Sequence, residues 1–146
     1  MLVIFVQSYF DEKYKLPFVR EKHKELGIDF CICKENKWGA EFYNVHPRKN
    51  EPVVIKHTND AFLYTFLEPI LRAHGIQTVV LTGLLTEACI DTTARSAQDR
   101  GYFVVVPEDC VASYNEKSHF FALETMRKSF VTVIPSKKLI GVWQKA

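Results

Sequence analysis

Cys89 is the residue whose type and position in this sequence best suit chemistry. An apolar stretch ends at Gly83 and a segment of helical character begins near Thr86, so the cysteine falls at about the third helical position. The first turn of a helix presents unpaired backbone N–H groups and the positive end of the helix dipole, which stabilise a thiolate and a developing oxyanion. Cysteines in this setting more often serve as small buried hydrophobic side chains, so spacing alone leaves both roles open.

Lys56 is the second candidate for chemistry. It directly follows the apolar run Val53–Ile55, at the point where a buried strand would end. If this strand and the strand before Cys89 are neighbours, the Lys56 ammonium group would stabilise the thiolate further. His57 comes next and can point into a pocket or away from it, because adjacency in the sequence does not fix the direction of its side chain.

Short apolar runs alternate with segments of helical spacing, and this alternation predicts the elements that position these residues. Most of the runs are continuously apolar, as in strands that are buried on both faces. Strands that alternate with helices form βαβ units in a parallel sheet, with ligands beyond the carboxyl ends of the strands. We predict strands at Leu2–Val6, Val53–Ile55, Thr78–Thr82, Tyr102–Val106 and Phe130–Ile134.

Helices are predicted between these strands from apolar spacing and from residues that favour helix ends. Thr65 and Glu68 form a predicted capping box for the first helix, and Thr86 is the predicted N-cap of the second. Residues 11–49 are polar and loop-like, so we predict a long excursion on the active-site side with one short helix around Val19–Leu26. The three main helices are predicted at Phe66–His74, Glu87–Arg100 and Glu116–Lys128.

Composition narrows the class of protein. A chain of 146 residues with 47% hydrophobic residues predicts a single domain over residues 1–146 with a substantial core. The formal charge is only +2 and the basic residues are scattered, which disfavours binding to nucleic acid or to a charged membrane surface. The apolar run at the start is too short for a membrane span and has no basic leader, so we expect a cytoplasmic protein. Its four cysteines are therefore expected to be thiols.

Four motifs resemble the isochorismatase-like family of cysteine hydrolases. The segment GLLTEACIDTTARSAQDRGY, followed by VVVPEDCVAS, is similar to the family's nucleophile turn and the helix after it. Upstream, WGAEFYNVHP and VVIKHTNDAF are similar to its Gly-Ala-Glu loop and its lysine-containing strand end. The motifs occur in the family's order between Trp38 and Ile134. The resemblance implies a three-layer αβα fold with a mostly parallel sheet.

The resemblance also implies roles for individual residues. Cys89 would be the nucleophile that forms a thioester acyl-enzyme, and Lys56 would orient and stabilise its charged partners. A cis peptide bond would lie between Leu84 and Leu85, and the backbone N–H groups of Leu85 and Cys89 would face the oxyanion. A substrate pocket lined by aromatic side chains is implied as well, with Trp38, Phe62 and His57 as its candidates.

One residue of the family's catalytic set has no counterpart. The family places an aspartate, its general base, at the end of the first central strand. If the N-terminal strand is that strand, Phe5 occupies the aspartate position. If it is instead the family's second strand, the first strand is missing and the chain is a shortened version of a longer hydrolase. We prefer the second register, because the first leaves too few residues for the βαβ unit that should follow, about 30.

Other acidic and metal-binding candidates fit poorly. Asp60, Glu87 and Asp109 are better explained as a loop residue, a helix-dipole partner and a turn cap than as a base. Nicotinamidases of this superfamily carry an Asp-x-His cluster and a further histidine around a metal, a grouping that this sequence lacks. Cys31 and Cys33 have no second pair of ligands, so packing or a loop is the preferred interpretation. We expect neither metal nor cofactor.

The sequence therefore predicts hydrolysis of a small amide, ureido or related carbonyl substrate through Cys89. A catalytically impaired member that serves as a binding or regulatory subunit is the first alternative, which the absent aspartate favours. A thiol redox protein is the weaker alternative, because no Cys-x-x-Cys pair supplies a resolving cysteine. We expect a homo-oligomer because oligomers are common in the family.

Overall fold

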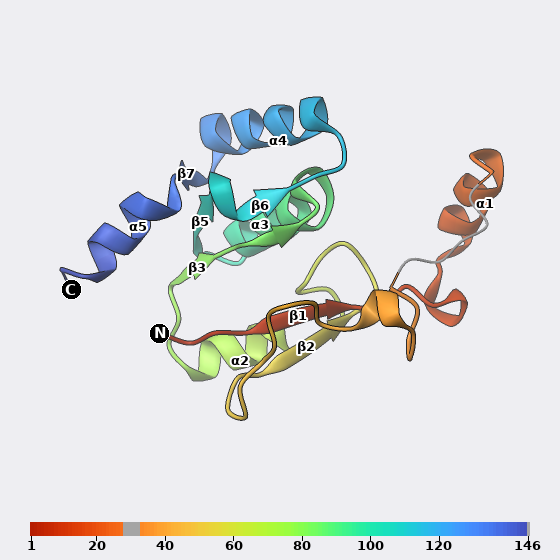
Figure 1. The fold of residues 1–146 in the computed structure, drawn as a ribbon, viewed down its shortest axis with the longest axis horizontal. Helices are drawn as coiled ribbons and strands as arrows, with labels where there is room; N and C mark the ends of the chain where they lie inside the picture. The colour runs from red at the N-terminus through yellow and green to blue at the C-terminus, as the bar shows by residue number, and fades with distance from the viewer. Residues whose placement is uncertain (28–32, 146) are drawn as a thin grey trace. The chain divides into compact units, whose positions relative to one another are not determined.

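The computed structural model describes residues 1–27 and 33–145 (Figure 1). Contacts along the chain divide it into two compact units, Met1–Thr65 and Phe66–Ala146. Lys56 belongs to the first unit and Cys89 to the second. The single domain over residues 1–146 stays a prediction.

The first unit contains a two-stranded parallel sheet. Strand β1 (Phe5–Ser8) pairs with β2 (Val53–Lys56), with Phe5 opposite Val53 and Ser8 opposite Lys56. The predicted strand at Leu2–Val6 is therefore displaced toward the C-terminus. The pairing of the two strands starts at Phe5, because the backbone N–H of Phe5 donates to the carbonyl of Pro52, the residue directly before β2.

The described part of the long excursion between β1 and β2 is mostly loop, as predicted. Helix α1 (Pro17–Glu25) has Pro17 in its first turn, where the missing N–H leaves no bond unmade, and it buries none of its residues. Two short 3-10 turns accompany it, η1 (Glu12–Tyr14) and η2 (Trp38–Ala40). The short helix predicted around Val19–Leu26 is confirmed with an earlier start.

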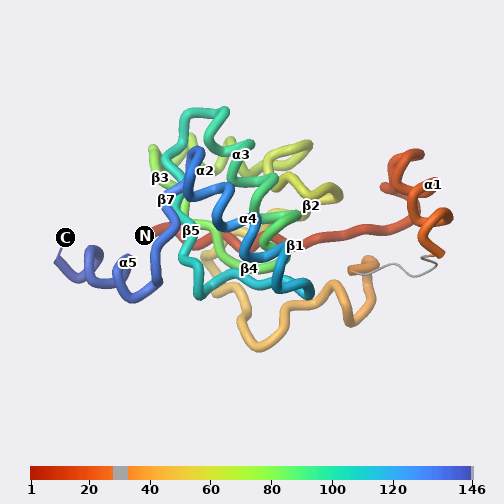
Figure 2. The backbone as a smooth tube through the Cα atoms, turned by 90° about the horizontal axis from the view of Figure 1, so that it is seen from above, coloured from red at the N-terminus to blue at the C-terminus, as the bar shows by residue number. Residues whose placement is uncertain are grey.

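The second unit is built on a three-stranded parallel sheet in the order β3-β5-β7. Figure 2 shows these strands side by side: β3 (Thr78–Val80), β5 (Phe103–Pro107) and β7 (Thr132–Ile134). Two shorter strands, β4 (Gly83–Leu84) and β6 (Val111–Ala112), pair in parallel with each other. Runs of β-branched residues thus form parallel strands, as the sequence predicts.

Six helical segments complete the described part of the second unit. Helix α2 (Leu67–Ala73) precedes β3, and the turn η3 (Thr86–Ile90) leads into α3 (Asp91–Asp99). Helix α4 (Glu116–Ser129) packs against β7 and η3, and α5 (Ser136–Trp143), which the sequence did not predict, follows β7. A short 3-10 turn, η4 (Glu108–Cys110), precedes β6. The core includes Ala94, Ala97, Val104, Val106 and Met126, each at most 4% exposed.

Two predicted N-caps are wrong. Phe66 is the N-cap of α2 and makes no side-chain capping bond, while the hydroxyl of Thr65 donates to the carbonyl of Ala61. Leu85, rather than Thr86, precedes η3. Thr65 thus bonds to a carbonyl four residues back, a local alternative to capping, whereas the side chain of Thr86 contacts His119, 33 residues away.

Candidate active site

Cys89 lies in a turn at the head of α3. Strand β4 ends in a cis peptide bond between Leu84 and Leu85, the bond for which the resemblance implies a cis conformation. The next residues form the π-helical turn η3, with Cys89 at its fourth position. The thiol is half-buried, and the turn continues directly into the regular helix. The local backbone therefore holds Cys89 at a helix start, one position later than the sequence predicts.

Thr86 attaches this turn to α4. Its side chain is fully buried, and Thr86 Oγ1 lies 2.8 Å from Nδ1 of His119. A buried hydroxyl needs such a partner, because an unmade hydrogen bond inside the protein costs about 1–3 kcal/mol. The pair fixes the first residue of the turn that carries Cys89.

Glu87 attaches the same turn to the segment after β6. The hydroxyl of Ser113 donates to Glu87 Oε1 over 2.5 Å. The other carboxylate oxygen of Glu87 is buried without a hydrogen-bond partner among the described residues, as is one oxygen of Asp91. Two carboxylates therefore flank Cys89 in sequence, each with one oxygen shielded from solvent. Glu87 lies in the first turn, as expected of a helix-dipole partner.

Lys56 ends strand β2 in the first unit and is only 4% exposed. Its ammonium group donates to the carbonyl of Thr58 over 2.7 Å and lies 5.1 Å from the centre of the Phe10 ring. A buried ammonium group requires such partners, because burial of an isolated charge is costly. Lys56 is thus a buried cation at a strand end. Its pairing with Cys89 stays a prediction.

The three predicted pocket residues have different environments within the first unit. Phe62 is buried at 5% exposure, whereas Trp38, in η2, is 79% exposed. The ring of His57 stacks on Tyr14 at 3.6 Å between centroids, and its Nδ1 lies 2.9 Å from the carbonyl oxygen of Tyr9. Their common role as pocket walls stays a prediction.

Asp60 and Asp109 have local structural contacts. Asp60 accepts a hydrogen bond from the backbone N–H of Phe62. Asp109 accepts from both the backbone N–H and the hydroxyl of Ser136, at 2.7 and 2.6 Å. These bonds hold the pKa of Asp109 below its ordinary value of 3.8. Each carboxylate therefore organises a turn or a helix start.

Across residues 1–27 and 33–145, no three His, Cys, Asp or Glu side chains are grouped so that they could hold a metal ion. Within the same ranges, no helix is long and apolar enough to cross a membrane. Cys33 is a thiol, and Cys31 lies outside the described residues.

The two residues that hold the turn around Cys89 in place, His119 and Ser113, were not predicted from the sequence. His119 and Ser113 lie 33 and 26 residues from their partners Thr86 and Glu87. No local pattern links residues at these separations, and a half-buried histidine or serine has no distinctive neighbours in the sequence.

Known proteins resemble this chain over nearly its whole length. The model of the isochorismatase domain family matches residues 1–138. A secreted isochorismatase effector of Verticillium dahliae, Isc1, is 34% identical over 103 residues, which is 68% of this chain and 54% of the relative. This chain thus spans about half the length of the curated relatives that it matches.

Two solved structures share the fold. An isochorismatase-like hydrolase from Alkaliphilus metalliredigens gives a TM-score of 0.84 at 27% identity, over 97% of this chain and 73% of the other. The nicotinamidase PncA from Bacillus subtilis gives 0.74 at 27% identity, over 91% and 74%. The predicted isochorismatase-like α/β fold is confirmed.

Proposed function

Because this chain belongs to the isochorismatase family, we propose that it hydrolyses a small amide, ureido or related carbonyl compound through Cys89. The observation that carries the proposal is the half-buried thiol in the turn Thr86–Ile90, at the start of a helix. Backbone N–H groups at a helix start stabilise negative charge on sulfur and on a substrate oxygen. The nicotinamidase of the same fold supports an amide as the substrate class.

The reaction has two steps. Cys89 loses its thiol proton and its sulfur attacks the carbonyl carbon; a C–S bond forms, the C–N bond breaks, and the leaving nitrogen takes up that proton. Water then attacks the thioester, which releases the carboxylic acid and restores the thiol. The backbone N–H groups of Leu85 and Cys89 are the proposed donors to the oxyanion in both steps.

Lys56 is the second residue that we propose for the reaction. Its burial and its strand-end position suit an ammonium group that stabilises a thiolate. The aromatic pocket residues Trp38 and Phe62, with His57, are proposed to contact the rest of the substrate. Their differing exposure makes Phe62 a candidate for a rigid wall of the pocket.

The proposed reaction has no carboxylate on β1 to serve as its general base. Strand β1 consists of Phe5, Val6, Gln7 and Ser8, so it carries no carboxylate. A positioned base contributes about 10²–10⁴-fold to rate. We therefore expect slow turnover compared with a family member that has the aspartate.

Ammonia release from a panel of small primary amides and ureido compounds, nicotinamide included, tests the proposal. The Cys89→Ala variant is expected to lose about a thousandfold or more of the rate, and Lys56→Met about a hundredfold. The matched control is Cys110→Ala, which removes an exposed thiol of the same unit and should retain the wild-type rate within about twofold. Mass spectrometry should find the acyl group on Cys89 during turnover.

A binding or regulatory subunit is the second candidate, favoured by the absence of a carboxylate from β1. In that case the protein would bind small carbonyl compounds in calorimetry without releasing ammonia. Its Cys89→Ala variant would then bind as the wild type does. This combination of results would exclude the hydrolase.

Location and assembly are further proposals. We propose a cytoplasmic homo-oligomer. A location outside the cell is the alternative, because the Verticillium relative is described as secreted. Fractionation of the producing cells distinguishes the two.

A further inference from the structure

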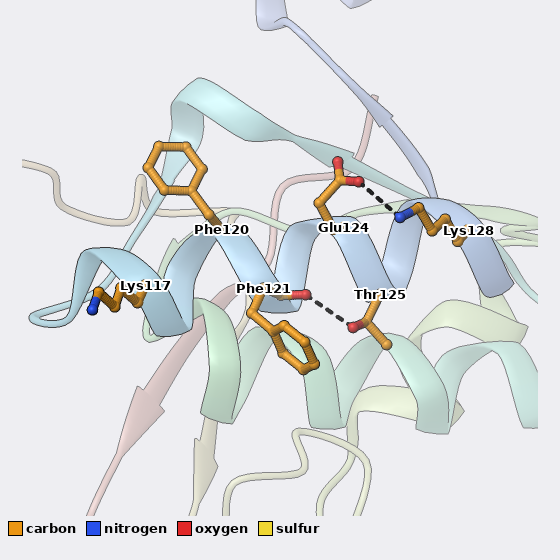
Figure 3. A pocket seen from close by; sticks show the side chains of 6 residues that line it. All are labelled: Lys117, Phe120, Phe121, Glu124, Thr125 and Lys128. Carbon is orange, nitrogen blue, oxygen red and sulfur yellow. Dashed lines mark hydrogen bonds and ion pairs between the residues drawn. The ribbon is translucent and has the colours of Figure 1, made fainter.

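The outer side of α4 presents an apolar surface bordered by charges. Its residues, together called the α4 face, line a shallow hollow along the helix (Figure 3). Phe121 is 77% exposed and Phe120 is 57% exposed. The α4 face consists of Lys117, Phe120, Phe121, Glu124, Thr125 and Lys128.

These phenylalanines lie outside the buried core of the second unit, and the ring of Phe120 contacts the edge of that core through His119, at 5.2 Å between ring centroids. Helix α4 buries Ala122, Leu123 and Met126 on its inner side, and Met126 has no exposed surface. The exposure of two neighbouring aromatic rings to water is unfavourable, because burial of their large apolar area would lower the free energy. Clustered aromatic residues with a charged border are typical of protein-binding surfaces.

Two oppositely charged residues of the α4 face, Lys117 and Glu124, lie at equal distances along the helix from the two rings. Lys117 and Glu124 are seven residues apart, which is two helical turns, so both lie on the same side of α4. Phe120 and Phe121 fall midway between them. If two α4 helices cross antiparallel at this midpoint, Lys117 of one copy faces Glu124 of the other, twice by symmetry.

We propose that the α4 face is the contact through which two copies of this chain form an antiparallel, two-fold symmetric dimer. Phe121 and Phe120 meet at the centre, and the pairs between Lys117 and Glu124 lie on either side of them. The charges fix the antiparallel direction, because parallel helices would oppose identical charges.

The aromatic rings supply most of the affinity. Glu124 already pairs within its own helix with Arg127 and, at 3.3 Å, with Lys128. The contact with a second copy therefore exchanges one exposed ion pair for another, which contributes little. A contact built on one helix is small, so the dimer should be weak and concentration-dependent.

Sedimentation velocity over a concentration series tests the dimer. The variant Phe121→Ser is expected to raise the dissociation constant about a hundredfold, because it removes the central ring from both copies. Phe103→Ser is the matched control, since Phe103 is 72% exposed at the start of β5, away from the α4 face. It should leave the dissociation constant within about threefold of the wild type.

A charge exchange tests the antiparallel arrangement. Lys117→Glu and Glu124→Lys should each weaken self-association about tenfold. Each substitution places two pairs of like charges opposite each other across the dimer, between positions 117 and 124. Mixed together, the two variants should form a heterodimer of about wild-type affinity, since each altered residue then meets its opposite charge. Both positions are on the helix surface, and circular dichroism verifies that the variants remain folded.

Several results would overturn the proposal. A wild-type protein that stays monomeric up to millimolar concentration excludes the dimer. An oligomer that is insensitive to Phe121→Ser uses another surface, and a mixture that associates no better than its components excludes this arrangement. None of these readouts depends on amide hydrolysis.

Discussion

Thr86 and His119 join two segments that are far apart in the sequence, and Cys89 follows the first of them by three residues. The hydroxyl of Thr86 is fully buried, so its bond to the imidazole cannot be replaced by water. A small shift of this turn would move the thiol and its neighbouring N–H groups together. Thr86 is therefore a positioning residue for the proposed nucleophile.

The Thr86→Val substitution tests this bond with almost no change in shape. It leaves Nδ1 of His119 without its partner, so the free energy of unfolding should fall by about 1–3 kcal/mol in urea titration. Thr86→Ser keeps the hydroxyl and should lose less. The control Thr78→Val, at an exposed position of β3, should change stability by at most about 0.5 kcal/mol. Equal effects at positions 86 and 78 would contradict a structural role for the bond.

Among the elements, α5 depends on a contact outside itself. It buries none of its residues, and Pro135, its N-cap, supplies no side-chain bond. Asp109 of η4 accepts both the backbone N–H and the hydroxyl of Ser136 at the first position of the helix. The carboxylate therefore replaces the missing cap and ties α5 to the sheet that it follows.

The Asp109→Ala substitution is expected to fray α5, because its first N–H loses its acceptor. Hydrogen exchange at Ser136 should quicken, and Asp109→Asn, which keeps one oxygen, should have a smaller effect. The pKa of Asp109 is lowered in the folded protein, so the stabilisation is complete above the ordinary pKa of 3.8 and is lost as the pH falls through the lowered value. Asp99→Ala, at the end of α3, is the control and should leave exchange at Ser136 unchanged.

Burial is distributed unequally over the whole molecule. In the second unit β5 is paired on both sides, and it contributes Val104 and Val106 to the core. In the first unit α1 has no buried residue. Local stability follows such differences, because opening a segment without buried apolar contacts requires little free energy.

Hydrogen exchange followed by mass spectrometry should rank these segments. Amides of β5 are expected to exchange slowest, and those of α1 about a hundredfold faster or more. A salt bridge such as Lys22–Glu25, at 2.7 Å on the surface of α1, should not change this order. Comparable protection of α1 and β5 would show that α1 is held by contacts other than those described.

The sequence by itself determined the family and the main elements, but not α5 or the short strands β4 and β6. Apolar runs predicted the parallel strands, helical spacing predicted α2, α3 and α4, and the motif around Cys89 predicted the isochorismatase-like fold, because these signals lie within short stretches of chain. The tertiary structure alone decided which partners Thr86, Glu87 and Asp109 take and that the side chain of Lys56 is buried. Such contacts join residues separated by up to 33 positions, and they depend on how the elements pack rather than on any local preference.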